Sequence, residues 1–147
     1  MTTHDKKTIL TERDLQHFQG NGYYWSTGKT FHPFVYTDGV LYAMMHGNAD
    51  WLLTLIGSWQ FETVVKDDKA LQKIQFWTLI VNDNHSVEMI CERDQGDVVV
   101  RQEIAWPNVL LSGVRFYLQH MEAYWAAARH PNRDPRKNGV LHLPSEY

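Results

Sequence analysis

Histidines are the residues of this sequence that could bind a metal or transfer protons near neutral pH. The chain has eight of them, and no two are four residues apart, the spacing that places two zinc ligands on one helix face. A single cysteine also excludes a multi-cysteine site. The sequence therefore predicts structural or solvated histidines, no metal site and no cofactor. The scattered histidines include His32, His46, His85, His120 and His130.

Cys91 could act as a nucleophile if a histidine lay beside it. It alternates with Val87 and Met89 on the apolar side of a β-prone run, which instead predicts a buried structural thiol. The motifs GxxxxGK[ST], GxGxxG, HExxH and GxSxG do not occur. We therefore assign no catalytic residue. An enzyme that uses the carboxylate of Asp38 and the imidazole of His46 remains an alternative hypothesis.

Charged residues on two neighbouring β-prone runs are a further candidate for acid–base work. Glu88 and Glu92 share the polar side of one run, and Arg101 and Glu103 share that of the next. Opposite charges on adjacent strands ordinarily form cross-strand pairs. We expect a solvated sheet face here rather than a catalytic carboxylate pair.

A basic loop and an aromatic run have compositions that suit binding. Residues 130–138 hold two prolines and several basic side chains, which predicts an exposed loop able to contact nucleic acid or an acidic protein. The aromatic run at residues 23–25 could stack on a nucleotide base. Nothing in the sequence brings the two segments together. The candidate binding residues, in these two segments and directly before the loop, are Tyr23, Tyr24, Trp25, Arg129, Arg133, Arg136 and Lys137.

Length and composition limit the class of protein. The chain has 147 residues and a mass of 17.2 kDa, the size of one domain. Its net charge of -3 excludes a highly basic duplex-coating protein. The sequence shows neither a membrane-spanning apolar run nor a signal peptide. We expect a single cytoplasmic domain over residues 1–147, with residues 1–10 frayed. The six Trp, seven Tyr and six Phe are compatible with a homodimer.

Two helices are expected in the first half of the chain. Thr11 and Asp14 form a capping-box pattern, which predicts a short helix that ends at the Gly-Asn-Gly of residues 20–22. A second helix is expected over residues 49–59, where apolar residues follow one helical stripe. The stripe consists of Trp51, Leu52, Leu55, Ile56 and Trp59.

A β-hairpin is expected between these helices. Residues 34–37 and 40–43 are rich in β-prone types and flank Asp38 and Gly39. An Asp-Gly pair suits a type I′ turn because both central positions need positive φ. The pattern therefore predicts two antiparallel strands over residues 34–43.

Three strands are expected in the second half. Residues 74–81, 86–92 and 98–104 are β-prone and are joined by short polar turns, which predicts an antiparallel meander. A long helix is expected to follow, beginning at Pro107 or Ser112 and ending near residue 131. Its buried face would comprise Leu110, Val114, Tyr117, Leu118, Met121 and Trp125.

This order of elements predicts the α+β class. The expected architecture is an antiparallel sheet of about five strands, made from the hairpin and the three-stranded meander. Two or three helices would pack on one face of that sheet.

Six short motifs follow one another along the chain: YTDG at 36–39, WL at 51–52, SWQ at 58–60, WTL at 77–79, RQE at 101–103 and LPSEY at 143–147. In this order they resemble a small family known only as a domain of unknown function, whose members occur in bacteria and on phages and plasmids. The resemblance covers residues 11–118 and 139–147, and residues 119–138 look like an insertion. It implies no activity, cofactor or catalytic residue.

The C-terminal motif ends in Glu146 and Tyr147, which are hard to explain as a frayed chain end. The tail either docks back onto the body of the protein or is recognised by a partner. Both residues therefore join the candidate binding residues.

The leading hypothesis is a non-catalytic binding protein of the kind carried by mobile elements. It would act on a host protein, such as a defence protein, or sequester a small ligand. A small hydrolase or transferase with carboxylate and histidine chemistry is one alternative. Nucleic-acid contact through the basic loop is another. The leading hypothesis predicts an exposed aromatic patch.

Overall fold

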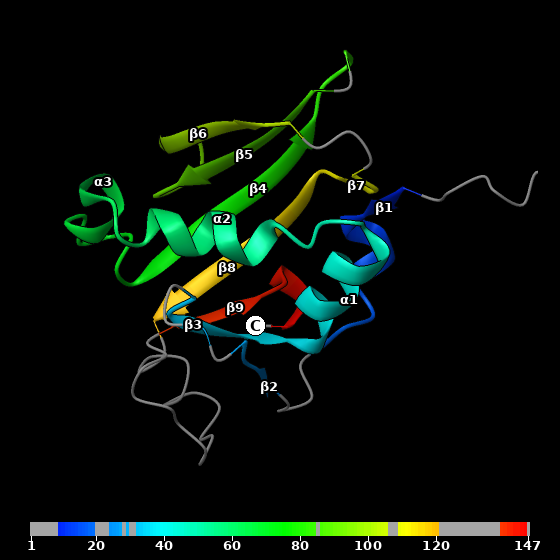
Figure 1. The fold of residues 1–147 in the computed structure, drawn as a ribbon, viewed down its shortest axis with the longest axis horizontal. Helices are drawn as coiled ribbons and strands as arrows, with labels where there is room; N and C mark the ends of the chain where they lie inside the picture. The colour runs from blue at the N-terminus through cyan, green and yellow to red at the C-terminus, as the bar shows by residue number, and fades with distance from the viewer. Residues whose placement is uncertain are drawn as a thin grey trace, which may run out of the picture.

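The computed structural model describes residues 9–19, 24–27, 29, 32–84, 86–105, 109–120 and 139–146. Within them the main sheet has seven strands, in the order β2-β3-β9-β8-β4-β5-β6 (Figure 1). The strands β3 and β9 are parallel, and all other neighbours are antiparallel. The class is α+β, as predicted, but the sheet is larger than the five strands expected. The strands are β2 Tyr24–Trp25, β3 Phe34–Thr37, β4 Ile74–Val81, β5 Val87–Glu92, β6 Val98–Ile104, β8 Val114–His120 and β9 Gly139–His142.

The antiparallel meander β4-β5-β6 is confirmed. Its three strands begin and end within one residue of the predicted ranges. Trp77, Leu79 and Met89 point to the core because alternate residues of a strand face opposite sides of the sheet. One register irregularity, between Cys91 and Glu92, interrupts the pairing of β5 with β6. The strong period-two pattern and the short turns explain why this part was predictable.

The predicted hairpin over residues 34–43 is wrong. The strand β3 is followed directly by the helix α1, Asp38–His46, instead of a second strand. Thr37 is the N-cap of this helix, and its hydroxyl accepts a hydrogen bond from the backbone N–H of Val40. β3 pairs instead with β9 from the far end of the chain. A distant strand and a good N-cap together outweigh the local Asp-Gly turn signal.

The predicted helix beginning at Pro107 or Ser112 is also wrong over the described residues. Here the chain forms the short strand β7, Leu111–Ser112, and the seven-residue strand β8. Val114, Phe116 and Leu118 are buried while Arg115 is exposed, which is the period of a strand. β8 lies between β4 and β9 in the middle of the sheet. Residues 121–138, which hold the rest of the predicted helix and the basic loop, lie outside the described residues.

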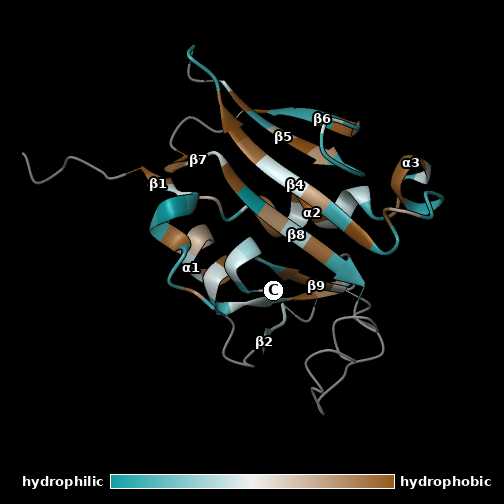
Figure 2. Cartoon of the chain, turned by 180° about the vertical axis from the view of Figure 1, so that it is seen from behind, coloured by the Kyte–Doolittle hydropathy of each residue, from teal (hydrophilic) through white to brown (hydrophobic). Residues whose placement is uncertain are grey.

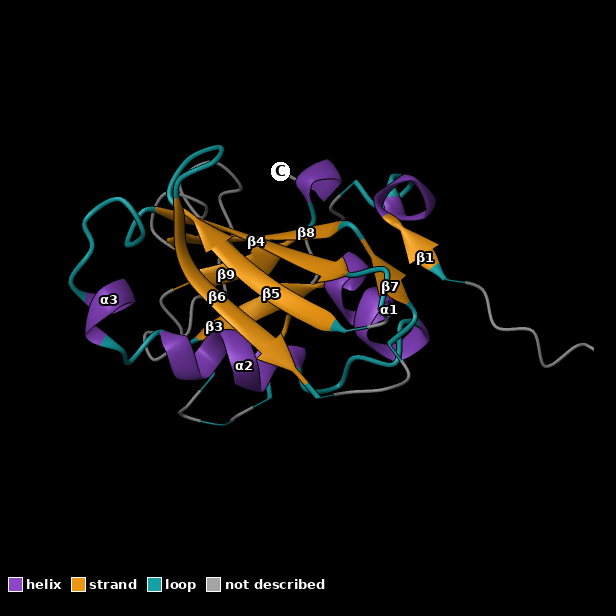
Figure 3. Ribbon diagram, turned by 90° about the horizontal axis from the view of Figure 1, so that it is seen from above, coloured by secondary structure: helices purple, strands orange, loops and turns teal. Residues whose placement is uncertain are grey.

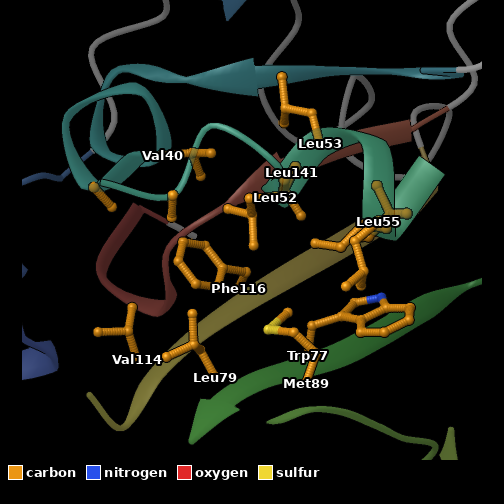
Figure 4. Packing of buried hydrophobic residues seen from close by; sticks show 14 of the residues in the cluster. Val40, Leu52, Leu53, Leu55, Trp77, Leu79, Met89, Val114, Phe116 and Leu141 are labelled. Atoms are coloured by element: carbon orange, nitrogen blue, oxygen red, sulfur yellow. The ribbon is translucent and has the colours of Figure 1, made fainter. Parts of the chain in front are cut away.

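The helix α2, Leu52–Trp59, packs across one face of the sheet (Figure 4). Leu52, Leu55 and Ile56 of its predicted stripe are buried against Trp77 and neighbouring core residues, so the stripe prediction is confirmed. The indole N–H of Trp59 donates to Oε1 of Gln102 on β6, 2.6 Å away. The helix thereby spans the sheet from its centre to the β6 edge.

The N-terminal segment is less helical than predicted. Leu10–Thr11 forms the strand β1, which pairs in parallel with β7, so Leu10 is held in place and not frayed. The expected helix is a single 3-10 turn, η2, Glu12–Leu15. Its capping box is present, with the backbone N–H of Thr11 donating to Oδ2 of Asp14 over 2.9 Å.

The two faces of the sheet are covered differently. α2 lies on one face, whereas the view from behind shows β4, β5 and β8 uncovered by any described helix (Figure 2). We call this second side of the sheet the open face. The short turns η2 and η3, Pro144–Glu146, lie at one end of it (Figure 3). The remaining helix, α3, spans Thr63–Lys66. Every helix in the described ranges is too short or too polar to cross a membrane.

Candidate functional site

The open face carries a surface hollow beside the turn that joins β5 to β6. Strand register places Phe76 between Glu92 on β5 and Tyr117 on β8, and it places Thr78 next to Arg115. The hollow has a volume of about 430 Å³. Its walls come from the paired strands β4, β5 and β8 and from the turn between β5 and β6. It is lined by Phe76, Thr78, Glu92, Asp94, Gln95, Arg115 and Tyr117.

An aromatic pair forms one wall of this hollow. The rings of Phe76 and Tyr117 meet edge to face, with centroids 4.9 Å apart and an interplanar angle of 89°. Tyr117 makes a second edge contact, with His142, at 5.9 Å. Both Phe76 and Tyr117 are half-buried, so part of each ring remains accessible. Accessible rings held by neighbours offer an apolar, electron-rich surface to a ligand.

Arg115 is held by a carboxylate and by the aromatic wall. Its Nε donates to Oε2 of Glu12 over 2.8 Å, and a second nitrogen of the guanidinium also pairs with that carboxylate. Its Nη1 donates to the hydroxyl of Tyr117 over 3.1 Å, and the guanidinium carbon lies 5.8 Å from the ring centroid. Hydrogen bonding to Glu12 raises the pKa of Arg115 above its ordinary value. The Glu12–Arg115 pair also borders a smaller hollow of about 260 Å³ beside η3.

The opposite wall of the hollow is acidic. Glu92 and Asp94 line it, and the carboxylate of Glu92 accepts the backbone N–H of Gly96 at 2.5 Å. Because Glu12 already neutralises Arg115, the two carboxylates leave the hollow with net negative charge. The site therefore combines an aromatic wall with an acidic one.

The C-terminal tail docks back onto the body of the protein. Glu146 is 3% exposed, and its carboxylate lies at the N-terminus of α1. Oε1 accepts from the hydroxyl of Thr37 at 2.5 Å and from the backbone N–H of Leu143 at 3.0 Å. Oε2 accepts from the backbone N–H of Gly39 at 3.1 Å. A carboxylate at the positive end of a helix is electrostatically favourable, so Glu146 acts as a cap for α1.

The other predicted binding residues are dispersed or lie outside the described part of the chain. Tyr24 packs against Val35 and Val140. Trp25 is 46% exposed, and its indole N–H donates to Oδ1 of Asp38 over 2.6 Å. These two lie on the edge strand β2, away from the hollow. Tyr23, Arg129, Arg133, Arg136, Lys137 and Tyr147 fall outside the described residues.

The alternative enzyme site is not assembled. Asp38 is the first residue of α1 and His46 is the last, so the length of the helix separates them. Asp38 binds Trp25, and the ring of His46 stacks on that of Tyr42 at 4.1 Å. The structure therefore does not bring the two together as an acid–base pair.

The cysteine and histidines have structural surroundings where they are described. Cys91 is fully buried, and burial raises the pKa of its thiol to about 12. The buried ring of His32 contacts the hydroxyls of Thr27 and Thr54 at 2.9 and 3.0 Å. Among the residues described, no three His, Cys, Asp or Glu side chains are grouped to hold a metal. His85 and His130 lie outside that part of the chain.

The sequence identifies Glu92 of the hollow only as part of a solvated sheet face, and it does not identify the other residues that line the hollow. The strand β4 was predicted, but Phe76 and Thr78 were not singled out, because nothing local shows that their side of the sheet lacks a helix. Arg115 and Tyr117 were assigned to a helix. The alternation of apolar and polar residues from 114 to 118 was the signal that could have placed them on one strand face.

His142 should make the stability of the protein dependent on pH. Its ring is fully buried, its Nδ1 donates to the carbonyl oxygen of Leu143 over 2.9 Å, and burial lowers its pKa below the ordinary 6.5. The folded state therefore binds this proton less readily than the unfolded state. The contribution of the neutral His142 ring to stability is complete above pH 6.5, and it is lost as the pH falls through the folded-state pKa.

We expect the free energy of unfolding to fall below pH 6.5, by at most about 1.4 kcal/mol per pH unit from this group. Denaturant unfolding at a series of pH values measures it. The variant His142→Gln should lose less stability than the wild type between pH 7.5 and 5.5. Equal losses in the two proteins would show that other groups cause the dependence.

Fold and site together define an α+β domain with one helix-covered sheet face and one open face that carries an aromatic and acidic hollow. The chain belongs to DUF6876, a family of unknown function, whose model matches residues 9–147. The matched range includes residues 119–138, which look like an insertion in the sequence. No curated protein and no solved structure is significantly similar to the chain.

Proposed function

We propose that this protein is a non-catalytic binding protein whose open-face hollow binds a positively charged segment of a partner protein. The single observation behind the proposal is the placement of the Phe76–Tyr117 pair opposite the carboxylates of Glu92 and Asp94. A lysine or arginine side chain has both an aliphatic stem and a cation. The aromatic wall suits the stem, and the acidic wall suits the charge.

Arg115 provides an internal example of this recognition. Its guanidinium lies beside the ring of Tyr117 and pairs with Glu12. A cation near an aromatic face contributes about 0.5–1 kcal/mol at an exposed site and about 2 kcal/mol when desolvated. Phe76 and Glu92 are cross-strand neighbours, so a ligand cation above the ring of Phe76 and beside the carboxylate of Glu92 would combine the same two interactions. The hollow therefore favours a basic peptide segment.

Charge also separates this proposal from nucleic-acid binding on the same face. Aromatic side chains on an open sheet face are a common platform for stacking single-stranded bases. Phosphates, however, require a basic surround, and the carboxylates of Glu92 and Asp94 would repel them. A protein with a basic segment is therefore the partner we expect for this surface.

The proposal is tested with a random peptide library displayed on phage and selected on the immobilised protein. We expect enrichment of peptides that contain Lys or Arg. Amide signals of Phe76, Thr78 and Tyr117 should shift when a selected peptide is added to the isotope-labelled protein. Glu92→Lys and Tyr117→Leu should each weaken binding about tenfold or more. The control Asp50→Lys reverses an exposed charge next to α2 and should bind normally.

Denaturant unfolding of each variant separates lost binding from lost folding. Enrichment of acidic or uncharged peptides would overturn the proposal, as would signal shifts away from the hollow. Salt-sensitive binding of a random single-stranded oligonucleotide that competes with the peptide would favour the nucleic-acid alternative instead.

A further inference from the structure

The strand β6 is an exposed edge of the main sheet. It has seven residues, and no described element pairs with its outer side (Figure 3). The backbone N–H and C=O groups on that side are therefore available to another strand. Proteins often block such an edge with proline, lysine or a very short strand. β6 contains neither proline nor lysine, so its edge is open to pairing.

In the regular part of β6, the residue types on one side of Gln102 mirror those on the other side. The register irregularity opposite Cys91 and Glu92 affects the beginning of the strand, which leaves residues 100–104 as the regular part. Their sequence is Val-Arg-Gln-Glu-Ile. Val100, Gln102 and Ile104 pair with the core-facing residues of β5, whereas Arg101 and Glu103 lie on the open face. Each side of the central glutamine thus carries one charged and one apolar residue.

From this pattern we infer that a second copy of this chain pairs with β6 in an antiparallel, two-fold symmetric dimer centred on Gln102. In that register Arg101 lies opposite Glu103 of the second copy, and the same pair is repeated across the two-fold axis. Val100 lies opposite Ile104 on the α2 side of the sheet. Opposite charges and apolar pairs directly across strands are both stabilising.

Charge excludes the neighbouring symmetric registers. An antiparallel pair centred on Arg101 would place two guanidinium groups opposite each other, and one centred on Glu103 would do the same with two carboxylates. Both arrangements are destabilising. A pair centred on Val100 would extend into the irregular beginning of the strand. A pair centred on Ile104 would extend past the end of the strand. The register centred on Gln102 therefore satisfies both charge and backbone regularity.

Glu103 gives this register a further advantage. Its cross-strand neighbour on β5 is Glu88, which has the same charge. The carboxylate of Glu88 is itself paired with the guanidinium of Arg101, with 3.0 Å between Oε2 and Nη1. Within the described residues Glu103 has no ion pair. Arg101 of the second copy would supply the missing cation.

Because the two-fold axis is perpendicular to the sheet, both open faces would lie on the same side of the dimer. Two copies of the hollow would then face one bivalent partner.

Light scattering coupled to size-exclusion chromatography tests the dimer on the full chain. We expect a concentration-dependent dimer in the wild type. Arg101→Glu and Glu103→Arg each create two like-charge pairs, so each should raise the dimer dissociation constant about tenfold or more. An equimolar mixture of the two variants should form a heterodimer, since each charge then meets its opposite.

Asp50→Arg, which reverses an exposed charge before the end of α2 that lies farther from β6, serves as the control and should dimerise like the wild type. A wild type that stays monomeric at high concentration would overturn the inference. Dimers that survive either reversal at β6, or variants that fail to associate when mixed, would do so as well. The peptide-binding experiment reports on the hollow, so the two proposals stand or fail separately.

Discussion

Replacing Glu146 with alanine is expected to lower the free energy of unfolding by about 3–5 kcal/mol. The carboxylate accepts hydrogen bonds from Thr37, Gly39 and Leu143. Its loss would leave two buried backbone N–H groups without acceptors, and each such group costs about 1–3 kcal/mol. The total free energy of unfolding of a protein domain is about 5–15 kcal/mol, so this loss would be a large part of it. Chemical denaturation monitored by circular dichroism measures the change.

Graded variants identify the cause of this loss. Glu146→Gln should be intermediate, because its amide oxygen still accepts from Thr37 and Leu143 while its NH₂ group meets the N–H of Gly39. Gly39→Ala should also destabilise, since a Cβ there would lie 2.6 Å from Oε1 of Glu146. Ser145→Ala, which removes one long hydrogen bond of 3.4 Å, is the neighbouring control and should cost less than about 1 kcal/mol. An unchanged stability in Glu146→Ala would refute the capping role of the tail.

Replacing Trp77 with alanine is expected to cost about 3–5 kcal/mol of stability. The side chain is fully buried at the centre of β4, beneath α2. Its indole N–H donates to Oε1 of Gln75 over 2.9 Å, and the amide of Gln75 exchanges hydrogen bonds with that of Gln60. The substitution would therefore open a large cavity and leave a buried polar network incomplete. Thermal and denaturant unfolding measure the effect.

Trp25→Ala provides the matched control for Trp77→Ala. Trp25 is 46% exposed and makes one side-chain hydrogen bond, to Asp38. Losing that bond and the partly solvated ring should cost about 1 kcal/mol. If the two tryptophan substitutions had similar effects, the assignment of Trp77 to the centre of the core would be incorrect.

The leading hypothesis of a binding protein predicted an exposed aromatic patch. Trp25 is exposed, but it lies on the edge strand β2, away from the hollow. Phe76 and Tyr117 form a half-buried aromatic pair on the open face; they come from strands more than thirty residues apart and meet only because β4 pairs with β8. Residue types at 23–25 were a reasonable signal for stacking, but the sequence does not state which aromatics meet. Contact between distant residues depends on sheet order.

The two incorrect elements share one physical cause. At residues 38–43 the local Asp-Gly signal favours a turn, but Glu146, more than a hundred positions away, accepts the N–H of Gly39 and stabilises a helix. At residues 114–120 apolar residues fit a helical stripe, but the alternating pattern also fits a strand. The strand is formed because it gains two pairing partners, β4 and β9.

The sequence by itself determined the α+β class, the meander over residues 74–104, the amphipathic helix α2 and the structural environment of Cys91. Each of these follows from apolar residues that recur with a period of two or 3.6, a pattern that is visible within a short stretch of sequence. Only the tertiary structure decided that β8 and β9 complete the sheet, that the side-chain carboxylate of Glu146 caps α1 and that one sheet face stays open. Those features depend on contacts between residues far apart in the chain, whose free energies no local pattern records.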